Sequence, residues 1–186
     1  MKTMQRASAV DRLLQPMRRR AAFATVAARP KPPYVLVVCF GNLCRSPFAA
    51  AMLRRELWGS GVCVESAGFV GPDRPAPAAG VAVAARRGVD LTTHRSRLLV
   101  GDLVRAAGLI VVMEVAQQRA ICSRFDRRAR DVPLLGDFDS ETGHSRTIAD
   151  PMDQPESAFE EVYTRIERCV GELGTALKRL TRKRTA

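Results

Sequence analysis

Residues 34–47 read YVLVVCFGNLCRSP, an apolar run that passes through a short loop into a helical pattern. The run at 34–39 has no charged residue, which favours a strand covered on both faces, as in a parallel sheet. The pair Gly41-Asn42 ends the strand, because both residue types favour turns. From Ser46, a good helix cap, apolar positions recur at helical spacing as far as Trp58. The segment therefore predicts a strand, a loop and a helix in immediate succession.

The remainder of the chain repeats this alternation. Apolar, β-branched runs predict strands at 62–66, 109–113 and 132–135, and periodic apolar positions predict helices at 75–87, 115–124 and 156–180. Strands that alternate with helices are typical of an α/β fold with a mostly parallel sheet.

Positive charge is concentrated at the two ends of the chain. The formal net charge is +11 over 186 residues; residues 1–33 hold eight Lys and Arg with one acidic residue, and residues 178–186 hold five with none. A nucleic-acid-binding face needs basic residues arranged on a folded surface, so we expect no specific nucleic-acid partner. We expect a basic, disordered extension at 1–33, a folded domain at 34–178 and a basic tail at 179–186. An electrostatic tether of these ends to nucleic acid or to an anionic membrane is the open alternative.

The cysteines indicate the compartment. Five are present, with no regular spacing: Cys39, Cys44, Cys63, Cys122 and Cys169. An odd, irregular set argues against the disulfide framework of a secreted protein, and the absence of a C-x-x-C pair argues against a zinc site. No apolar run approaches the ~18 residues that a membrane span needs. We expect a cytoplasmic protein that uses no metal and no other cofactor.

The loop after the first predicted strand is the expected site, because ligands bind at the carboxyl ends of strands in open α/β sheets. Its backbone N–H groups and the following helix N-terminus favour an anion such as phosphate. Cys39 begins the loop and is predicted to act as a thiolate nucleophile. Arg45 follows six residues later, so its planar guanidinium can fold back and hold two phosphate oxygens. The Ser46 hydroxyl can donate a hydrogen bond to the thiolate.

The same spacing of cysteine and arginine occurs a second time, at Cys122 and Arg128. This copy contains no glycine and follows no predicted strand. We therefore interpret it as part of a helix and its basic end, not as a second phosphate site.

Residues 39–47, CFGNLCRSP, resemble the signature of low-molecular-weight protein tyrosine phosphatases. The resemblance covers roughly 34–178 and includes ESAG at 65–68, HRSR at 94–97, VME at 112–114 and DP at 150–151. It is closest to the bacterial branch associated with exopolysaccharide and capsule production. It implies a three-layer α/β fold with a four-stranded parallel sheet flanked by helices. It also implies hydrolysis of phosphotyrosine in a protein, with a tyrosine kinase or another component of polysaccharide export as the expected substrate.

The resemblance assigns the general acid. Spacing alone leaves Asp137, Asp139, Asp150 and Asp153 as loop candidates. Asp150 is followed by proline and matches the family's acid, so the resemblance implies that Asp150 protonates the leaving oxygen and later activates water.

Further roles follow from the same resemblance. Asn42, Ser66 and His94 are expected to hold the phosphate loop in shape. Cys44 matches a second loop cysteine that can form a reversible disulfide with the nucleophile. The residues expected around the substrate are Phe40, Gly41, Asn42, Leu43, Cys44 and Ser46.

Some positions depart from the family pattern or separate it from its neighbours. Met152 stands where an aromatic residue usually walls the substrate ring, so Phe40 and Phe69 are expected to contact the ring instead. Leu43 stands where protein-arginine phosphatases favour threonine, which favours a tyrosine phosphatase. Arsenate reductases of this fold need two further cysteines downstream, where Cys122 is alone. A catalytically weak phosphate-binding module, tethered by basic tails, is the alternative from another class.

Overall fold

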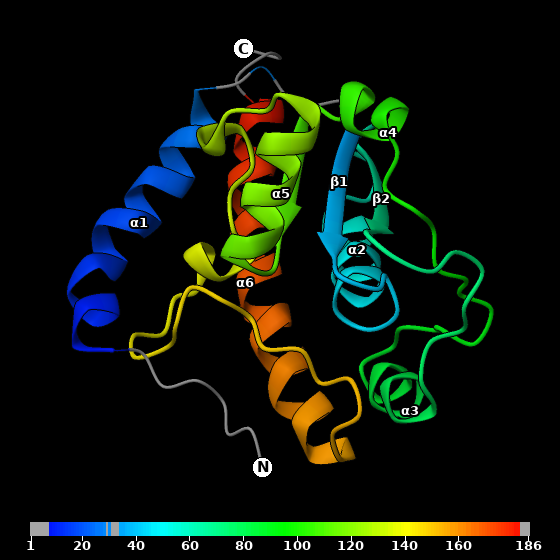
Figure 1. Cartoon of the computed structure of the whole chain (residues 1–186). Coiled ribbons are helices and arrows are strands. Elements are labelled where there is room, and N and C mark those ends of the chain that lie inside the picture. The colour runs from blue at the N-terminus through cyan, green and yellow to red at the C-terminus, as the bar shows by residue number, and fades with distance from the viewer. Residues whose placement is uncertain (1–7, 29, 31–33, 183–186) are drawn as a thin grey trace.

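The computed structural model describes residues 8–28, 30 and 34–182 of the chain. A parallel sheet with helices on both sides forms its centre (Figure 1). Its strands are β1 (Tyr34–Cys39), β2 (Cys63–Gly68) and β3 (Leu109–Val112), in the order β2-β1-β3. Three of the expected strands are thus confirmed, apart from their end residues.

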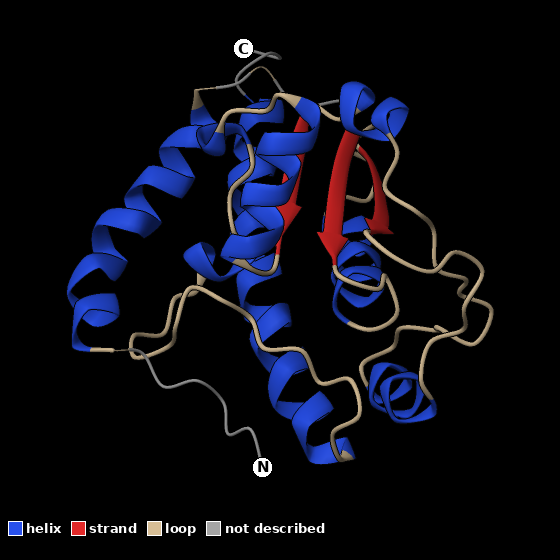
Figure 2. Cartoon of the chain, viewed as in Figure 1, coloured by secondary structure: helices blue, strands red, loops and turns tan. Residues whose placement is uncertain are grey.

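The helices cover most of the remaining described chain (Figure 2). They are α1 (Ala9–Ala27), α2 (Arg45–Glu56), α3 (Ala78–Arg86), α4 (Gly101–Ala106), α5 (Val115–Phe125) and α6 (Glu156–Arg182), with short 3-10 helices η1 (Ala129–Asp131) and η2 (Leu135–Phe138). The helices predicted at 75–87, 115–124 and 156–180 correspond to α3, α5 and α6. Among the described residues, no helix is both long and apolar enough to cross a bilayer.

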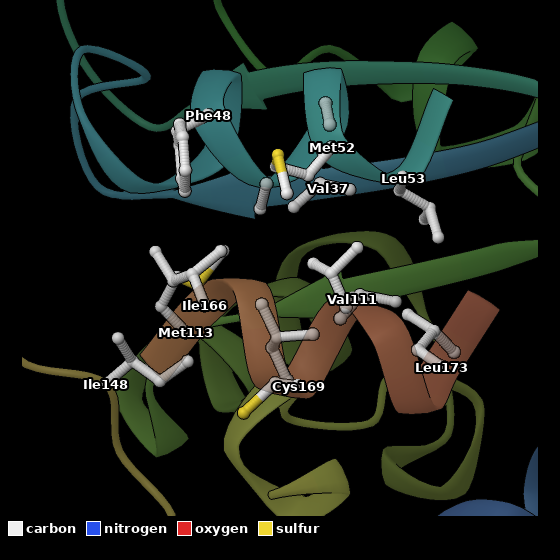
Figure 3. Packing of buried hydrophobic residues seen from close by; sticks show 14 of the residues in the cluster. Val37, Phe48, Met52, Leu53, Val111, Met113, Ile148, Ile166, Cys169 and Leu173 are labelled. Carbon is white, nitrogen blue, oxygen red and sulfur yellow. The ribbon is translucent and has the colours of Figure 1, made fainter. Parts of the chain in front are cut away.

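β1 separates two hydrophobic clusters, because its side chains alternate between the faces of the sheet. Val35 and Val37 belong to the cluster under α2 and α6, and Leu36 and Val38 belong to the cluster under α4 and α5. Figure 3 shows the first cluster, where apolar side chains of α2 face those of α6 beside Val37 of β1 and Val111 of β3. The expected three layers and the burial of β1 on both faces are therefore observed.

The fourth strand, expected at 132–135, is not formed. Only one parallel bridge, between Leu134 and Val112, continues the sheet beyond β3. The Val112 amide donates to the Pro133 carbonyl at 3.1 Å, but Pro133 has no N–H to donate in return. Leu135 then turns into η2. The described sheet has three strands, which corrects the expected four.

The amino-terminal segment also differs from the expectation of disorder. Residues 9–27 form α1, which begins with a capping box between Ser8 and Asp11. Figure 1 shows α1 beside α6, on the side away from β1. Ala22 and Val26 are buried against the core, and the Phe23 ring meets the Phe138 ring edge-on at 5.3 Å.

Basic residues near both ends of the described chain lie in helices. In α1, Arg18 pairs with Asp11, and Arg19 pairs with Glu172 of α6 at 2.9 Å, so these arginines stabilise a packed helix. At the other end, α6 continues to Arg182, which places the first residues of the expected tail in a helix. Residues 1–7 and 183–186 lie outside the described part of the chain.

Candidate active site

Cys39 is the last residue of β1, and the loop that leads into α2 starts there. The sulfur accepts hydrogen bonds from the Asn42 backbone N–H at 3.2 Å and from the Ser46 hydroxyl at 3.0 Å. Both donors stabilise a thiolate more than a thiol. Ser46 is therefore not the cap of the helix, as the sequence predicted, but a hydrogen-bond donor to the sulfur. The helix α2 begins at Arg45, and its N-cap residue, Cys44, makes no side-chain capping bond.

Asn42 holds the loop through both its side chain and its backbone. Its backbone lies in the left-handed region, with φ of 53°, which asparagine tolerates better than most residues. Its amide nitrogen donates to Ser46 at 2.9 Å and to Ser66 at 2.8 Å, and its amide oxygen accepts from the Arg97 N–H at 2.9 Å. The His94 Nε2 lies 2.7 Å from the Asn42 carbonyl. The structure thus brings Asn42, Ser66 and His94 together. That they hold the phosphate loop in shape, as the resemblance implies, stays a prediction.

His94 contacts the loop from behind. Burial lowers the pKa of His94 below its ordinary value, so the neutral ring predominates at pH 7. Its Nε2 then carries the proton and donates to the Asn42 carbonyl. His94 and Ser66 line a separate cavity of about 430 Å³ behind the loop.

Arg45 lies at the centre of a carboxylate cluster and is 1% exposed. Its Nη1 donates to Glu114 at 2.6 Å and to the Ile148 carbonyl at 2.9 Å, and its Nη2 pairs with Asp150. Although burial by itself acts in the other direction, the negative charges of Cys39, Asp150 and Glu114 raise the pKa of Arg45. Its Nε is buried without a hydrogen-bond partner among the described residues. Both hydrogens of Nη1 are thus engaged. On the other edge of the guanidinium, formed by Nε and Nη2, Asp150 is the one partner among the described residues.

Glu114 is a site residue to which the sequence analysis gave no role. It lies two residues after the end of β3 and is the N-cap residue of α5, and Gln117 donates to its carboxylate at 2.9 Å. The signal was its position, since a charged residue shortly after a buried parallel strand lies at the ligand-binding edge of the sheet. Here it fixes one edge of Arg45.

A cavity of about 240 Å³ opens above the loop. Five loop residues line it, together with three residues from the loop around Asp150 and two from the segment after β2: Cys39, Phe40, Gly41, Leu43 and Cys44, then Asp150, Met152 and Asp153, then Val70 and Arg74. Arg45 and Ser46 are not on its wall, because Arg45 is covered by its carboxylate partners and Ser46 is buried beneath the sulfur. Phe40 reaches this cavity and Phe69 does not.

Burial favours the thiol form of two other cysteines, Cys44 and Cys122. Burial, followed by the charges of Asp150 and Cys39, raises the pKa of Cys44 far above its ordinary value. Burial also raises the pKa of Cys122 in α5, and Arg128 is paired with Asp131. The second copy of the cysteine–arginine spacing therefore forms no phosphate loop.

Together, these residues place a sulfur with two donors and a carboxylate on the wall of one small cavity, with Arg45 paired to that carboxylate. A sulfur stabilised in this way can attack a phosphorus atom, and a carboxyl group can exchange a proton with the departing oxygen. Within the described residues, no three metal-ligating side chains gather into a cluster. That the reaction needs no metal stays a prediction.

Comparisons with known proteins show the family of this chain. The family described as "Low molecular weight phosphotyrosine protein phosphatase" matches residues 34–184. "Probable low molecular weight protein-tyrosine-phosphatase EpsP" of Ralstonia nicotianae is 42% identical over 137 residues, which cover 73% of this chain and 90% of EpsP.

Solved structures share the fold. The tyrosine phosphatase amsI of Erwinia amylovora has a TM-score of 0.70 at 30% identity, over 77% of this chain and 91% of amsI. The YwlE arginine phosphatase of Geobacillus stearothermophilus has the same TM-score of 0.70 and the same identity of 30%, over 78% of this chain and 93% of YwlE. Similarity of fold alone therefore does not separate these two substrates.

Proposed function

Because this chain belongs to the low-molecular-weight protein-tyrosine phosphatase family and is a phosphomonoester hydrolase, we propose that it hydrolyses protein phosphotyrosine through a phosphocysteine on Cys39. The observation that carries the proposal is the environment of the Cys39 sulfur. It accepts two hydrogen bonds at the start of the loop and lines the same small cavity as Asp150.

The first step is attack of the Cys39 thiolate on phosphorus. The substrate phosphate rests on the backbone of the loop and on Arg45. Since Glu114 and the Ile148 carbonyl hold Nη1, the phosphate uses Nε and Nη2, and it displaces Asp150 from Nη2. This edge of a guanidinium binds two oxygens at once, which lysine cannot do.

Asp150 supplies the proton in this scheme. Its carboxyl group is 40% exposed and lines the cavity beside Cys39, where it can protonate the phenolate oxygen as the bond to phosphorus breaks. The resulting carboxylate then takes a proton from water, which attacks the phosphocysteine and releases inorganic phosphate. Ser46 stabilises the sulfur both when it attacks and when it leaves.

The substrate ring lies against Phe40 and Met152 on the cavity wall. Leu43, on the same wall, stands where the arginine phosphatases favour threonine, and this supports tyrosine over arginine as the phosphorylated residue. Comparison of kcat/KM on a phosphotyrosine peptide and a phosphoarginine peptide separates the two. We expect the phosphotyrosine peptide to be favoured in the wild type, and Leu43→Thr to reduce that preference.

The physiological substrate follows from the family branch rather than from the site. Resemblance to the exopolysaccharide-associated branch supports a tyrosine kinase, or another component of polysaccharide export, as the phosphoprotein. Contact with an anionic membrane stays a prediction. In the described amino-terminal helix, Arg12 and Arg20 are the exposed basic residues available for it, since Arg18 and Arg19 pair with carboxylates.

The test is hydrolysis of two aryl phosphates, p-nitrophenyl phosphate and phenyl phosphate, in the presence of EDTA. We expect wild-type activity on both and none from Cys39→Ser. Asp150→Ala should slow phenyl phosphate by about 10²–10⁴-fold and p-nitrophenyl phosphate by less, because nitrophenolate needs a proton less when it leaves.

An inactive wild type, with its fold intact and its thiols reduced, would overturn the enzyme proposal. The phosphate-binding module would then be the function to pursue, by measuring binding of phosphotyrosine peptides. Equal loss on both aryl phosphates in Asp150→Ala would assign Asp150 a structural role, through Arg45, instead of proton transfer.

A further inference from the structure

A second cavity adjoins the catalytic one. It has a volume of about 600 Å³ and shares Phe40, Val70 and Asp150 with the cavity above the loop. From these shared residues it extends along α5, which begins at the end of the sheet where the loop after β1 leaves (Figure 1). We call this cavity the α5 groove.

The middle of the α5 groove is apolar. Phe40 and Phe69 line it, and Ala116 and Ala120, one helical turn apart on α5, leave room between the helix and the rings. Phe40 is 55% exposed and Val70 is 37% exposed, and neither belongs to the hydrophobic core. Exposed apolar side chains that gather beside a catalytic cavity are typical of a binding site, because a ligand that covers them removes apolar surface from water.

The acidic groups of the groove are already engaged. Glu114 pairs with Arg45 and accepts from Gln117, and Asp150 pairs with Arg45. These carboxylates lie at the catalytic end and are compensated there. They leave the remainder of the groove without uncompensated negative charge.

Arg124 brings a positive charge to the groove. It is exposed, and its guanidinium lies 6.0 Å from the centre of the Phe69 ring and 5.7 Å from that of Phe125. Among the described residues it forms no ion pair with a carboxylate. Stacking on the rings orients the guanidinium and leaves its N–H groups able to bind an anion.

The length of the groove matches a peptide segment. Arg124 follows Glu114 by ten residues of helix, which corresponds to about 15 Å along α5. An extended chain covers that distance in about four to five residues. An acidic side chain within this reach of the phosphotyrosine can therefore meet Arg124.

We propose that the α5 groove is a substrate subsite that binds an apolar side chain next to the phosphotyrosine and, through Arg124, an acidic residue beyond it. The inference rests on the proposed function and names its substrate class: phosphotyrosine in an acidic segment with an apolar neighbour. The net charge of +11 favours acidic partners in general, but the groove makes recognition depend on particular positions.

The test uses three phosphotyrosine peptides of equal length. The first carries Phe next to the phosphotyrosine and Glu about four residues away, on both sides. The second replaces Phe with Ser, and the third replaces Glu with Lys. We expect the wild type to have the highest kcat/KM on the first peptide, with losses of about five- to tenfold on each of the others.

Two variants probe the groove directly. Ala120→Phe fills it, and Arg124→Glu reverses its charge; neither residue lies in the catalytic cavity. We expect Ala120→Phe to reduce the preference for Phe over Ser. Arg124→Glu should lower kcat/KM on the Glu peptide about fivefold or more and raise it on the Lys peptide. Both variants should leave p-nitrophenyl phosphate hydrolysis unchanged, because that substrate does not reach the groove.

Arg119→Glu is the matched control for charge. Arg119 is exposed on α5 but does not line the groove, and its reversal changes the net charge by the same amount. Equal effects of Arg119→Glu and Arg124→Glu on the peptides would mean long-range attraction only and would overturn the subsite. So would equal kcat/KM on all three peptides.

Failure of the proposed function can be told apart from failure of the subsite. If the wild type does not hydrolyse p-nitrophenyl phosphate, the reaction is wrong. The groove is then tested through the affinity of the Cys39→Ser variant for the same fluorescently labelled peptides. The subsite is supported if the Glu peptide binds more tightly than the Lys peptide and if Arg124→Glu, added to this variant, reverses that order. Equal affinities for the three peptides overturn it.

Discussion

Ser46 joins the nucleophile to the network that shapes its loop. Its hydroxyl donates to the Cys39 sulfur at 3.0 Å and accepts from the Asn42 amide at 2.9 Å. One hydroxyl group thus serves both the chemistry and the geometry of the loop. A hydrogen bond to a charged group contributes more than one between neutral groups, about 1.5–3 kcal/mol.

Replacement of this residue separates its two contributions. We expect Ser46→Ala to lower kcat on an aryl phosphate about ten- to hundredfold, because the thiolate loses a donor. Ser66→Ala is the control, since Ser66 bonds to the same Asn42 amide but not to the sulfur. Steady-state kinetics with a melting curve for each variant provide the measurement. An equal loss of kcat in both would show that loop shape alone accounts for the effect.

The loop after β1 depends on β2 as well as on its own residues. Gly68 ends β2 and is paired with Cys39 in the sheet register. A Cβ atom at Gly68 would lie 2.7 Å from the Asn42 nitrogen and 2.8 Å from both the Gly41 carbon and the Phe40 oxygen. These are backbone atoms, so the loop has to shift to make room.

We therefore expect Gly68→Ala to impair catalysis with little loss of secondary structure. Displacement of a catalytic loop by a fraction of an ångström is expected to reduce kcat/KM by about ten- to hundredfold. Gly171→Ala is the matched control, because a Cβ there meets nothing within 4 Å and alanine favours the helix. That variant should keep full activity and gain up to about 1 kcal/mol of stability. Full activity in Gly68→Ala would mean that the loop adapts without cost.

At the scale of the whole molecule, Asp139 connects the end of η2 to α6. It is 1% exposed and accepts hydrogen bonds from Arg165 at 2.8 Å and from Arg168 at 2.6 Å. Asp139→Asn leaves Arg165 buried beside an uncharged group. Removal of one partner of a buried pair costs about 3–5 kcal/mol, so we expect a clear fall in Tm. Asp102→Asn, which breaks the exposed pair with Arg105, should change Tm little.

The same pair predicts how stability changes with pH. Burial by itself raises the pKa of Asp139, but the hydrogen bonds from Arg168 and Arg165 outweigh it and hold the pKa below its ordinary value. The unfolded chain therefore binds the proton more readily than the folded one. The contribution of Asp139 to stability is present above about pH 4 and is lost as the pH falls through the lower folded value. Tm should fall more between pH 5 and pH 3 in the wild type than in Asp139→Asn; identical slopes would contradict this.

α1 should add stability without affecting catalysis. It packs through Phe23 on Phe138, and Arg19 donates to the Phe138 carbonyl at 2.6 Å, but none of its residues lines the catalytic cavity. We expect removal of residues 1–30 to lower the free energy of unfolding by about 2 kcal/mol or more, which is roughly 5 °C in Tm. Activity on p-nitrophenyl phosphate should stay within about twofold. The point variant Phe23→Ala should reproduce part of the fall, and an unchanged Tm in the truncated chain would show that α1 does not stabilise the domain.

The sequence by itself determined the local elements around the site. β1, its loop and α2 were predicted at their observed places, because an apolar run, a turn pair and a helical period are properties of neighbouring residues. The grouping of Cys39, Asn42 and Ser46 in one loop follows from the same short range. The resemblance of this segment to a known signature was enough to predict the family, which the comparisons confirm.

Only the tertiary structure decided which distant residues meet. Arg45 lies among Glu114, Ile148 and Asp150, which are far from it in sequence and reach it only when β3 and the later loops pack beside β1. The α5 groove likewise joins Phe40 and Phe69 to a helix whose sequence has no signature of its own. Tertiary packing also decided that residues 9–27 form a packed helix, where the charge pattern predicted a disordered extension. It likewise decided that a single bridge stands in place of the predicted fourth strand. These features depend on burial and pairing between separate segments, and local periodicity and composition carry no information about them.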